Sequence, residues 1–257
     1  MTTLLEVRDL TKSFGGVKAV SNVSFELGES EMVAIIGPNG AGKSTCFNML
    51  GGQLVPDTGN ISLNGISIGG LPPRAIWRLG VGRTFQVAST FGSMTVCENV
   101  QMALASLRSE TARPWSRMED LYREEALQLL ERVQMLEHTD RSCATLAYGD
   151  VKRVEIAIAL ANAPSLLLMD EPTAGMAPKE RFGLMELVTS VVAERNVAVL
   201  FTEHDMDVVF GYAHRIIVLD RGQIVAAGSP AEVRASPKVR QIYLGDEGPG
   251  SMERVTT

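Results

Sequence analysis

Cysteine is scarce in this sequence of 257 residues, which contains only Cys46, Cys97 and Cys143. Because their number is odd and they lie far apart, they offer neither a disulfide framework nor the paired spacing of a zinc site. Long hydrophobic runs are missing too, since no apolar stretch approaches the roughly 20 residues that span a bilayer. The first residues, Met-Thr-Thr-Leu-Leu-Glu-Val-Arg-Asp, lack the basic start and apolar stretch of a signal peptide. We therefore expect a chain of a reducing cytosol that associates with membranes only through partners.

Basic residues are outnumbered, because 24 Lys and Arg stand against 30 Asp and Glu and give a formal net charge of −6. This excess of acid argues against a broad basic face, so no nucleic-acid partner is expected. The hydrophobic share of 45% and the charged share of 21% are ordinary for a globular protein. A chain of this length can bury a full core as one large domain or as two unequal lobes.

One short segment indicates a ligand directly. Residues 37–45 read Gly-Pro-Asn-Gly-Ala-Gly-Lys-Ser-Thr, which matches the phosphate-binding pattern G-x-x-x-x-G-K-[ST]. Its glycines let successive N–H groups face one concavity, its lysine adds a charge for the β- and γ-phosphates, and its serine hydroxyl can ligate Mg²⁺. The apolar run Met32–Ile36 before it and the helical character of Cys46–Leu50 after it supply the required strand–loop–helix setting. We predict that a nucleoside triphosphate is bound by Gly37, Pro38, Asn39, Gly40, Ala41, Gly42, Lys43, Ser44 and Thr45.

The hydrophobic pattern predicts an α/β nucleotide-binding lobe that is interrupted by a helical insertion. The pair Asn64-Gly65 favours a type I′ turn between short strands at Gly59–Leu63 and Ile66–Ile68. Helical texture fills residues 86 to 163, with an apolar stripe along Glu119–Glu137 and a further helix over Val151–Ala163. The other expected strands are Leu4–Leu10, Val17–Leu27, Met32–Ile36, Ser165–Asp170, Val197–Thr202, Arg215–Leu219 and Gln223–Ala227, with a helix at Lys179–Arg195.

Two adjacent carboxylates follow an apolar strand. Leu166–Met169 is hydrophobic throughout, as expected for a central parallel strand, and it ends at Asp170-Glu171. Open α/β sheets bind ligands at the carboxyl ends of their strands, and beside a phosphate loop this pair is typical of a Walker B segment. We expect Asp170 to support the Mg²⁺ shell and Glu171 to accept a proton from the attacking water, or to orient it. His204 follows another apolar strand at the same edge, where it could reach the γ-phosphate or the water, although a lone histidine there is usually structural.

The order of these features resembles the ATP-binding subunit of ABC transporters. The phosphate loop is followed by Gln86, by Leu146–Asp150 before a helix, by Asp170-Glu171 and by His204, so the resemblance covers residues 4–245. It implies a P-loop NTPase core with an antiparallel β subdomain and a helical subdomain, and it implies ATP and Mg²⁺ as cofactors. The expected domains are 1–85 (first part of the core with the β subdomain), 86–163 (helical subdomain), 164–245 (rest of the core) and 246–257 (a loose tail).

The resemblance also implies roles for single residues. Phe14 matches the aromatic position that stacks on adenine, and Val20 is expected to line the same pocket; without the family, Phe14 would be interpreted as a core aromatic. Gln86 lies where the core meets the helical insertion. The implied catalytic residues are Lys43, Gln86, Glu171 and His204, and the implied metal ligands are Ser44, Gln86 and Asp170.

Several further segments look like the LivG-type branch of this family, which powers uptake of branched-chain amino acids and relatives such as urea or other amide solutes. The lipopolysaccharide-export ATPase is a near cousin that fits these segments less well. A soluble ABC ATPase without a transport role, or an ATP switch that does not hydrolyse, are the other readings left open. The matching segments are Ser13–Gly16, Lys18–Val20, Gly82–Gln86, Phe91, Met94–Val96, Glu98–Val100, Leu146–Gly149 and Ile242–Gly245.

The family implies partners as well. Its ATPases work as head-to-tail pairs on membrane permeases, which in importers receive solute from a periplasmic binding protein. The chain is therefore expected to be cytoplasmic and peripheral on the inner membrane. A permease helix would dock beside Gln86–Thr95, with Phe91 and Met94 as contacts or, alternatively, as core residues. The solute stays open, because selectivity belongs to the permease and the binding protein.

The segment Leu146-Ala147-Tyr148-Gly149-Asp150, here named the signature segment, departs from the usual Leu-Ser-Gly-Gly-Gln that caps the partner's ATP. Ala147 lacks the serine hydroxyl, and Asp150 places an acid where Gln is usual, unless it caps a helix that begins at Val151. We hypothesise an asymmetric heterodimer with a LivF-type partner, in which the site closed by this segment turns over slowly. A homodimer is the other possibility. Equally open is that backbone contacts from Gly149 suffice and that the substitutions are neutral.

Overall fold

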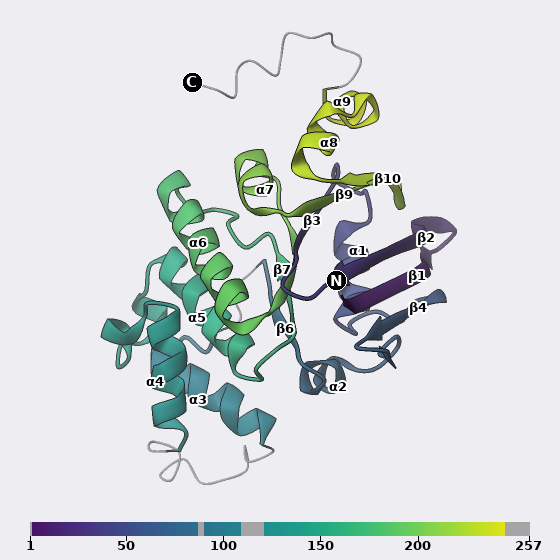
Figure 1. The fold of residues 1–257 in the computed structure, drawn as a ribbon. Helices are drawn as coiled ribbons and strands as arrows, with labels where there is room; N and C mark the ends of the chain where they lie inside the picture. Colours follow the sequence, from purple (N-terminus) through teal and green to yellow (C-terminus); the bar gives the residue numbers. More distant parts are fainter. Residues whose placement is uncertain (1, 87–89, 109–120, 245–257) are drawn as a thin grey trace.

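A computed structural model describes residues 2–86, 90–108 and 121–244 (Figure 1). Its central sheet has six strands in the order β10-β9-β3-β8-β7-β6. The first five in chain order are parallel to one another, and β10 runs antiparallel to β9 at one edge. The strands are β3 (Met32–Ile36), β6 (Val81–Thr84), β7 (Leu166–Asp170), β8 (Ala198–Thr202), β9 (Arg215–Asp220) and β10 (Gln223–Gly228). The parallel pairing places the carboxyl ends of these strands at one edge.

A second sheet is antiparallel and has the order β2-β1-β4-β5. The predicted hairpin turn is confirmed, because Asn64 and Gly65 both adopt positive φ, at 50° and 76°, as a type I′ turn requires. The predicted strand at Leu4–Leu10 extends further in both directions, because its later residues continue to pair with β2. The four strands are β1 (Thr3–Phe14), β2 (Val17–Gly28), β4 (Thr58–Leu63) and β5 (Ile66–Ser67).

The two sheets are separated by α1 (Lys43–Leu50), so the molecule is layered (Figure 1). Alternate residues of β3 show this layering. Val33 and Ile35 pack with α1 and the antiparallel sheet in one core cluster. Met32 and Ala34 belong to a second cluster on the opposite face, which is covered by α3 (Val96–Leu107), α5 (Tyr148–Leu160) and α6 (Pro178–Arg195). Both faces of the central strands are therefore buried, which explains their continuous apolar sequences.

The helical insertion is confirmed, but one predicted helix within it is shorter than expected. The stripe along Glu119–Glu137 forms a helix, α4, only over Arg123–Arg132. Gln134 has a φ of 59°, which ends the helical path, and Leu136 follows in a 3₁₀ turn where 45% of it is exposed. The first residues of the predicted stripe lie outside the described part of the chain.

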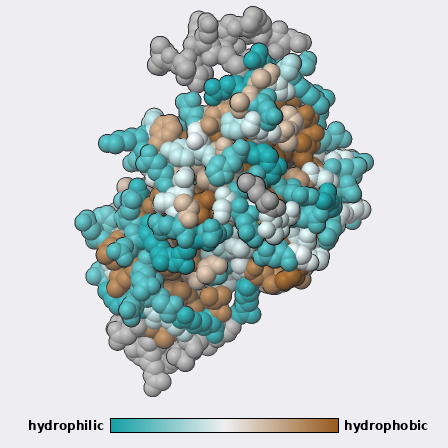
Figure 2. All heavy atoms as spheres, in the orientation of Figure 1, coloured by the Kyte–Doolittle hydropathy of each residue, from teal (hydrophilic) through white to brown (hydrophobic). Residues whose placement is uncertain are grey.

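Four short helices were not anticipated as separate elements: α2 (Pro73–Arg78), α7 (Met206–Tyr212), α8 (Pro230–Ala235) and α9 (Pro237–Leu244). The predicted loose tail after residue 245 lies outside the described residues. Within those residues, no helix is long and apolar enough to cross a membrane. The face drawn in Figure 2 is largely hydrophilic, with separate hydrophobic areas.

Candidate functional site

The phosphate loop joins the carboxyl end of β3 to α1, and two of its positions require glycine. Gly42 has a φ of 102°, and a Cβ there would lie 2.3 Å from the carbonyl oxygen of Ala19. Gly37 has a φ of 156°, and a Cβ there would lie 2.1 Å from the carbonyl oxygen of Leu219. Any side chain at either position would displace the loop. The neighbouring backbone of β2 and β9 therefore fixes the path of the loop.

The rest of the loop is tied down on one side and open on the other. Ala41 is buried, and its carbonyl oxygen accepts a hydrogen bond of 2.9 Å from the N–H of Gly222 in the turn between β9 and β10. Asn39, Gly40 and Ser44 are exposed, whereas Pro38 and Thr45 are half-buried. A ligand can thus reach the loop from the solvent side.

Lys43 begins α1, and its ammonium group folds back over the loop. Nζ donates hydrogen bonds to the carbonyl oxygens of Gly37, at 2.7 Å, and Pro38, at 3.1 Å. Burial lowers the pKa of this lysine, and the charges of Glu171 and Asp170 act in the opposite direction. A buried cation beside the N–H groups of the first turn of a helix is an arrangement that binds phosphate oxygens.

Strand β7 brings two carboxylates to the same edge of the sheet. Asp170 accepts a hydrogen bond of 2.7 Å from Thr202 Oγ1 and lies 4.0 Å from a guanidinium nitrogen of Arg83. Glu171 has a φ of 48°, and its backbone N–H donates to the hydroxyl and the carbonyl oxygen of Thr202, at 3.0 and 3.2 Å. This conformation is uncommon for a residue other than glycine. Thr202 on β8 therefore fixes both acidic residues.

Gln86 and His204 both meet Glu171. Gln86 Nε2 donates to one carboxylate oxygen at 2.8 Å, and His204 Nε2 lies 2.9 Å from the other. The three residues follow β6, β7 and β8, which are neighbours in the sheet. The Glu171 side chain is 18% exposed and that of His204 is 49% exposed. The sequence predicted all three as site residues, and the structure places them side by side; their catalytic roles stay predictions.

Glu203 supports this cluster and was missed by the sequence analysis. It is 3% exposed, and its carboxylate accepts hydrogen bonds from the N–H and the hydroxyl of Thr173, at 2.8 and 2.7 Å, and from the N–H of His204 at 3.2 Å. It thus ties the segment after β7 to the segment after β8. The available signal was an acidic residue between an apolar strand and His204. The sequence could not show that its side chain points inward to Thr173.

The signature segment opens α5, which begins earlier than predicted. Ala147 is the N-cap residue and offers no side-chain hydrogen bond, and Tyr148 is the first helical residue. Asp150 therefore lies inside the first turn, so the expectation that it caps a helix beginning at Val151 is wrong. Asp150 instead contributes a negative charge near the helix N-terminus, where such a charge is stabilising.

The two predicted base-pocket residues differ in exposure. Phe14 ends β1, is 47% exposed, and has the Lys12 ammonium 5.8 Å from its ring centroid. It therefore presents an open aromatic face. Val20 has no exposed surface and packs beneath Gly42, where its methyl group would lie 3.4 Å from an added Cβ. The structure thus shows Val20 as a support of the phosphate loop, and its place in a base pocket stays a prediction.

The residues predicted to hold Mg²⁺ supply oxygen atoms of the kind this ion prefers. Ser44 offers an exposed hydroxyl next to Lys43, Asp170 offers a carboxylate held by Thr202, and Gln86 offers an amide oxygen while its nitrogen binds Glu171. Hydroxyl and carboxylate oxygens with several waters are a usual Mg²⁺ shell. Within the described residues, no group of three or more His, Cys, Asp or Glu could hold a metal by itself. The donor set therefore fits an ion that is shared with phosphate.

Comparison with known proteins identifies the family. The protein-family model described as "ABC transporter" matches residues 20–174, which is more than half of the chain. The chain belongs to the ABC transporter family. A second model, described as "Branched-chain amino acid ATP-binding cassette transporter", matches residues 223–249 of this ABC chain.

Several relatives match nearly the whole ABC chain. The high-affinity branched-chain amino acid transport ATP-binding protein LivG of Salmonella typhimurium is 43% identical over 95% of this chain and 98% of its own length. The corresponding protein BraF of Pseudomonas aeruginosa is 42% identical over 95% of this chain and 98% of its own length. The lipopolysaccharide export system ATP-binding protein LptB of Acidithiobacillus ferridurans is 37% identical over 96% of this chain and 99% of its own length.

Solved ABC structures confirm the predicted fold. A cassette in its ADP conformation aligns with a TM-score of 0.86 and 32% identity, covering 96% of this chain and all of that one. A dimeric cassette in a post-hydrolysis state, bound to ADP and Pi, aligns with a TM-score of 0.74 and 27% identity over 88% of this chain. The P-loop core with an antiparallel subdomain and a helical subdomain is therefore shown.

In this ABC chain, α5 is hydrogen-bonded to the backbone of Gln86, the residue whose side chain contacts Glu171. Lys152 is 2% exposed, and its Nζ donates to the carbonyl oxygens of Phe85, at 2.6 Å, and Gln86, at 3.0 Å. The same Nζ pairs with Glu155 at 3.0 Å. The hydroxyl of Tyr148 donates to the Gln86 carbonyl at 3.2 Å. These hydrogen bonds therefore hold α5 against the residues that follow β6.

We expect Lys152→Met to destabilise the fold strongly. The substitution keeps most of the side-chain volume but removes a buried cation from two carbonyl oxygens and from Glu155, so the free energy of unfolding should fall by about 3 kcal/mol. Urea denaturation of the full chain measures this change. Lys179→Met, on the exposed start of α6, is the control and should change stability little. A loss for Lys152→Met no larger than for the control would contradict the importance of this buried contact.

Proposed function

We propose that this chain binds and hydrolyses ATP to power a membrane importer of branched-chain amino acids or related amide solutes. The LivG and BraF relatives, which cover almost all of the chain, support the transport class. The match over residues 223–249 favours the same branch over lipopolysaccharide export. The proposal of hydrolysis rests on the contact of Glu171 with both Gln86 and His204. These residues lie at the edge of the sheet from which the phosphate loop also starts.

The nucleotide would be held from two sides. Adenine stacks on the exposed ring of Phe14, an interaction worth about 1–3 kcal/mol for stacked bases. The phosphates lie on the loop, where Lys43 exchanges the carbonyl oxygens of Gly37 and Pro38 for the phosphate oxygens. Because the ammonium already lies over the loop, this exchange needs only a movement of its flexible side chain. Bound Mg²⁺, held by Ser44 and Asp170 with Gln86, would neutralise charge on the β- and γ-phosphates.

Hydrolysis would then depend on positioning one water molecule. Glu171 accepts a proton from the water, or orients the water, as the water oxygen attacks the γ-phosphorus and the bond from that phosphorus to the bridging oxygen breaks, so that ADP leaves. Gln86 and His204 already hold the two oxygens of this carboxylate, one each, so they fix its direction. The His204 side chain is 49% exposed and could contact the γ-phosphate. The strained backbone of Glu171, anchored by Thr202, resists reorientation of the group.

The proposal includes partners and a location. Two cassettes, this chain and a LivF-type second ATPase or a second copy, would pair head to tail, each closing the other's ATP with its signature segment. Membrane permeases and, indirectly, a periplasmic binding protein complete the transporter, and no nucleic acid takes part. The chain would lie on the cytoplasmic face of the inner membrane. Phe91 is 57% exposed and Met94 is half-buried, which favours Phe91 as a permease contact.

The proposed domains follow the observed connections. Residues 1–85 carry the antiparallel sheet, α1 and β6, and residues 86–163 carry the helical insertion. Residues 164–245 return to the core with β7–β10. Residues 246–257 are the proposed tail.

The transport function is tested by reconstitution. The chain, assembled in vesicles with the permeases and second ATPase encoded by neighbouring genes, should import labelled leucine or urea only when ATP and the binding protein are present. Uptake of leucine but not of urea would place the chain with amino acids, and the reverse would place it with amides. ATPase activity that responds to neither solute, but rises with lipopolysaccharide-export components, would overturn the branch.

A serine in place of Ala147, at the start of α5, should raise the ATPase rate of the assembled transporter. In Ala147→Ser, the new hydroxyl would cap α5, which has no side-chain cap now, and would add a donor toward the ATP of the partner. A cap of this kind stabilises a helix by about 1 kcal/mol, and we expect a rate gain of severalfold because one preorganised donor can contribute more than tenfold. Phosphate release measures the rate.

The control for this prediction is Ala144→Ser, which adds a hydroxyl at an exposed position just before the signature segment. It should leave the rate unchanged. If Ala147→Ser raises the melting temperature but leaves the rate unchanged, then the serine acts only as a helix cap. The hypothesis of a slow composite site would then be wrong, and the contacts from Gly149 would suffice.

A further inference from the structure

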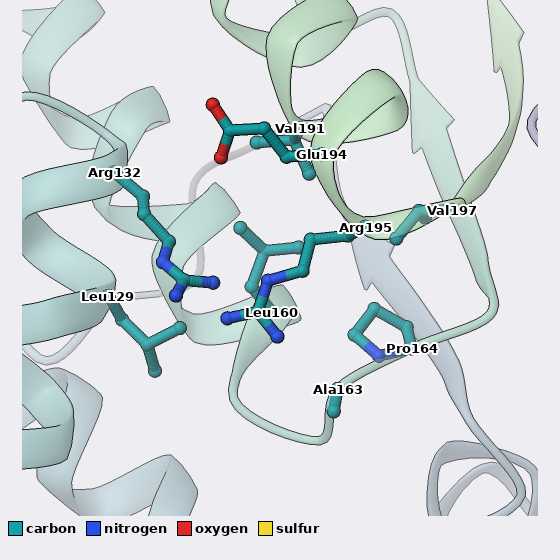
Figure 3. A pocket seen from close by; sticks show the side chains of 9 residues that line it. All are labelled: Leu129, Arg132, Leu160, Ala163, Pro164, Val191, Glu194, Arg195 and Val197. Carbon is teal, nitrogen blue, oxygen red and sulfur yellow. The ribbon is translucent and has the colours of Figure 1, made fainter.

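A cavity far from the nucleotide site lies between the helical insertion and the core (Figure 3). It measures about 170 Å³ and is lined by the ends of α4, α5 and α6 and by the chain entering β7 and β8. The amino ends of β7 and β8 lie at the edge of the sheet opposite to Asp170 and Glu171. A ligand here would therefore not compete with ATP for space, but it would contact both parts of the chain that the proposed domain boundary at residue 163 separates.

Two arginines turn into this cavity. Figure 3 shows the guanidinium groups of Arg132, from the last turn of α4, and Arg195, from the last turn of α6, directed to the same space around Leu160. Within the described residues, neither has a hydrogen-bond or ion-pair partner; Arg132 is half-buried and Arg195 is exposed. Each also gains from the negative end of its helix, but that effect does not require the two groups to share one cavity. Two cations that face each other repel, and a bound anion would relieve this repulsion.

The rest of the lining defines the shape of the ligand. Leu160, Val191 and Val197 are buried and form an aliphatic surface beneath the arginines. Glu194 lines the same cavity, and Figure 3 shows its carboxylate on the side of Arg132. An aliphatic surface, two guanidinium groups and one carboxylate match the three parts of a zwitterionic aliphatic α-amino acid. A phosphate would use the arginines but would leave the aliphatic surface uncovered and would face Glu194 unfavourably.

We propose that this cavity binds an aliphatic α-amino acid, with its carboxylate on Arg132 and Arg195, its ammonium group toward Glu194 and its side chain on Leu160 and the valines. Occupancy would hold α4 and α5 against α6 and so restrict movement of the helical insertion relative to the core. The ligand class follows from the cavity alone. Its meaning as feedback by the imported solute rests on the proposed function.

Binding is measured by calorimetric titration of the purified full chain, without permeases. L-Leucine should bind with a dissociation constant near 1 mM, because a half-open site of this size uses few contacts against the cost of association. 4-Methylpentanoate, which lacks the ammonium group, should bind more weakly, and 3-methylbutylamine, which lacks the carboxylate, should not bind. Inorganic phosphate is titrated in parallel. Binding of phosphate but not of leucine would mean that the cavity is a simple anion site and that the amino-acid assignment is wrong.

The variant Arg132→Gln/Arg195→Gln keeps two polar, though shorter, side chains and removes both charges. It should weaken leucine binding at least tenfold, since charge-assisted hydrogen bonds to the carboxylate are lost. Arg74→Gln, on the exposed surface of α2, is the matched control and should bind as the unchanged chain does. Equal binding by the double variant, or no binding by the unchanged chain at 20 times the expected dissociation constant, would overturn the proposal. ATP binding by the same samples is measured separately, so a chain that binds ATP but not leucine would reject this site and leave the transport function standing.

Discussion

Glu171→Gln is expected to lower the ATPase rate of the assembled transporter by about 10²–10⁴-fold. The substitution keeps the size of the side chain but removes its ability to accept a proton. Gln86 Nε2, which donates to one Glu171 oxygen at 2.8 Å, can donate to the amide oxygen instead, and His204 Nε2, 2.9 Å from the other, can accept from the amide nitrogen in its Nδ1–H tautomer. Phosphate release at saturating ATP measures the loss.

Binding of ATP should survive the same substitution. Lys43 and the loop glycines do not use Glu171 as a hydrogen-bond partner, and removing a negative charge near Lys43 also removes a repulsion toward the phosphates. Titration with a fluorescent ATP analogue should give an affinity equal to or higher than that of the unchanged chain. Glu137→Gln, in the exposed turn after α4, is the control for loss of a carboxylate. An ATPase rate within threefold of the unchanged transporter would mean that Glu171 is not the proton acceptor or water-orienting group.

Much of this site could be predicted because each part has a local sequence rule. The loop needs glycines at fixed spacing, and Gly37 and Gly42 are indeed the positions where a side chain would collide with backbone. Continuous apolar sequences identified β7 and β8 as buried strands, and parallel strands end at one edge. The placement of Glu171 and His204 together follows from that topology alone. Gln86 depended on the family resemblance, since a glutamine in a loop has no distinctive pattern.

The features that were missed depend on side-chain direction and on contacts across the fold. Lys152 and Glu203 are charged residues in the sequence, yet both are almost fully buried because each has partners from a distant segment. The end of α4 was misjudged because the apolar repeat continues to Leu136, although the backbone turns at Gln134. Val20 was assigned to a base pocket by family position, and its complete burial in β2 beneath the loop was not foreseen. None of these outcomes has a signal in local periodicity.

Gly42→Ala is expected to abolish useful ATP binding, with the affinity falling by about 100-fold or more, which corresponds to at least 2.7 kcal/mol. The φ of 102° is strained for any residue with a Cβ, and the added atom would lie 2.3 Å from the carbonyl oxygen of Ala19. That oxygen belongs to β2, which pairs with β1 and cannot withdraw without breaking the sheet. The loop must therefore move instead, and the N–H groups and Lys43 at the start of α1 move with it.

Two matched variants separate the collision from the backbone strain. Gly65→Ala has a similar φ of 76° with nothing within 4 Å of the added Cβ, so it should cost only the backbone term of about 1–2 kcal/mol in unfolding free energy and leave ATP binding unchanged. Gly40→Ala lies in the phosphate loop itself, at a φ of 81° and again with nothing within 4 Å. It should weaken ATP binding less than Gly42→Ala does, because the loop can keep its path. If Gly42→Ala binds ATP within threefold of the unchanged chain, the contact with Ala19 does not shape the loop, and the phosphate site must tolerate a displaced backbone. Loss of binding in Gly42→Ala alone would show that close packing of the loop against β2, and not glycine flexibility as such, sets the geometry of the phosphate site.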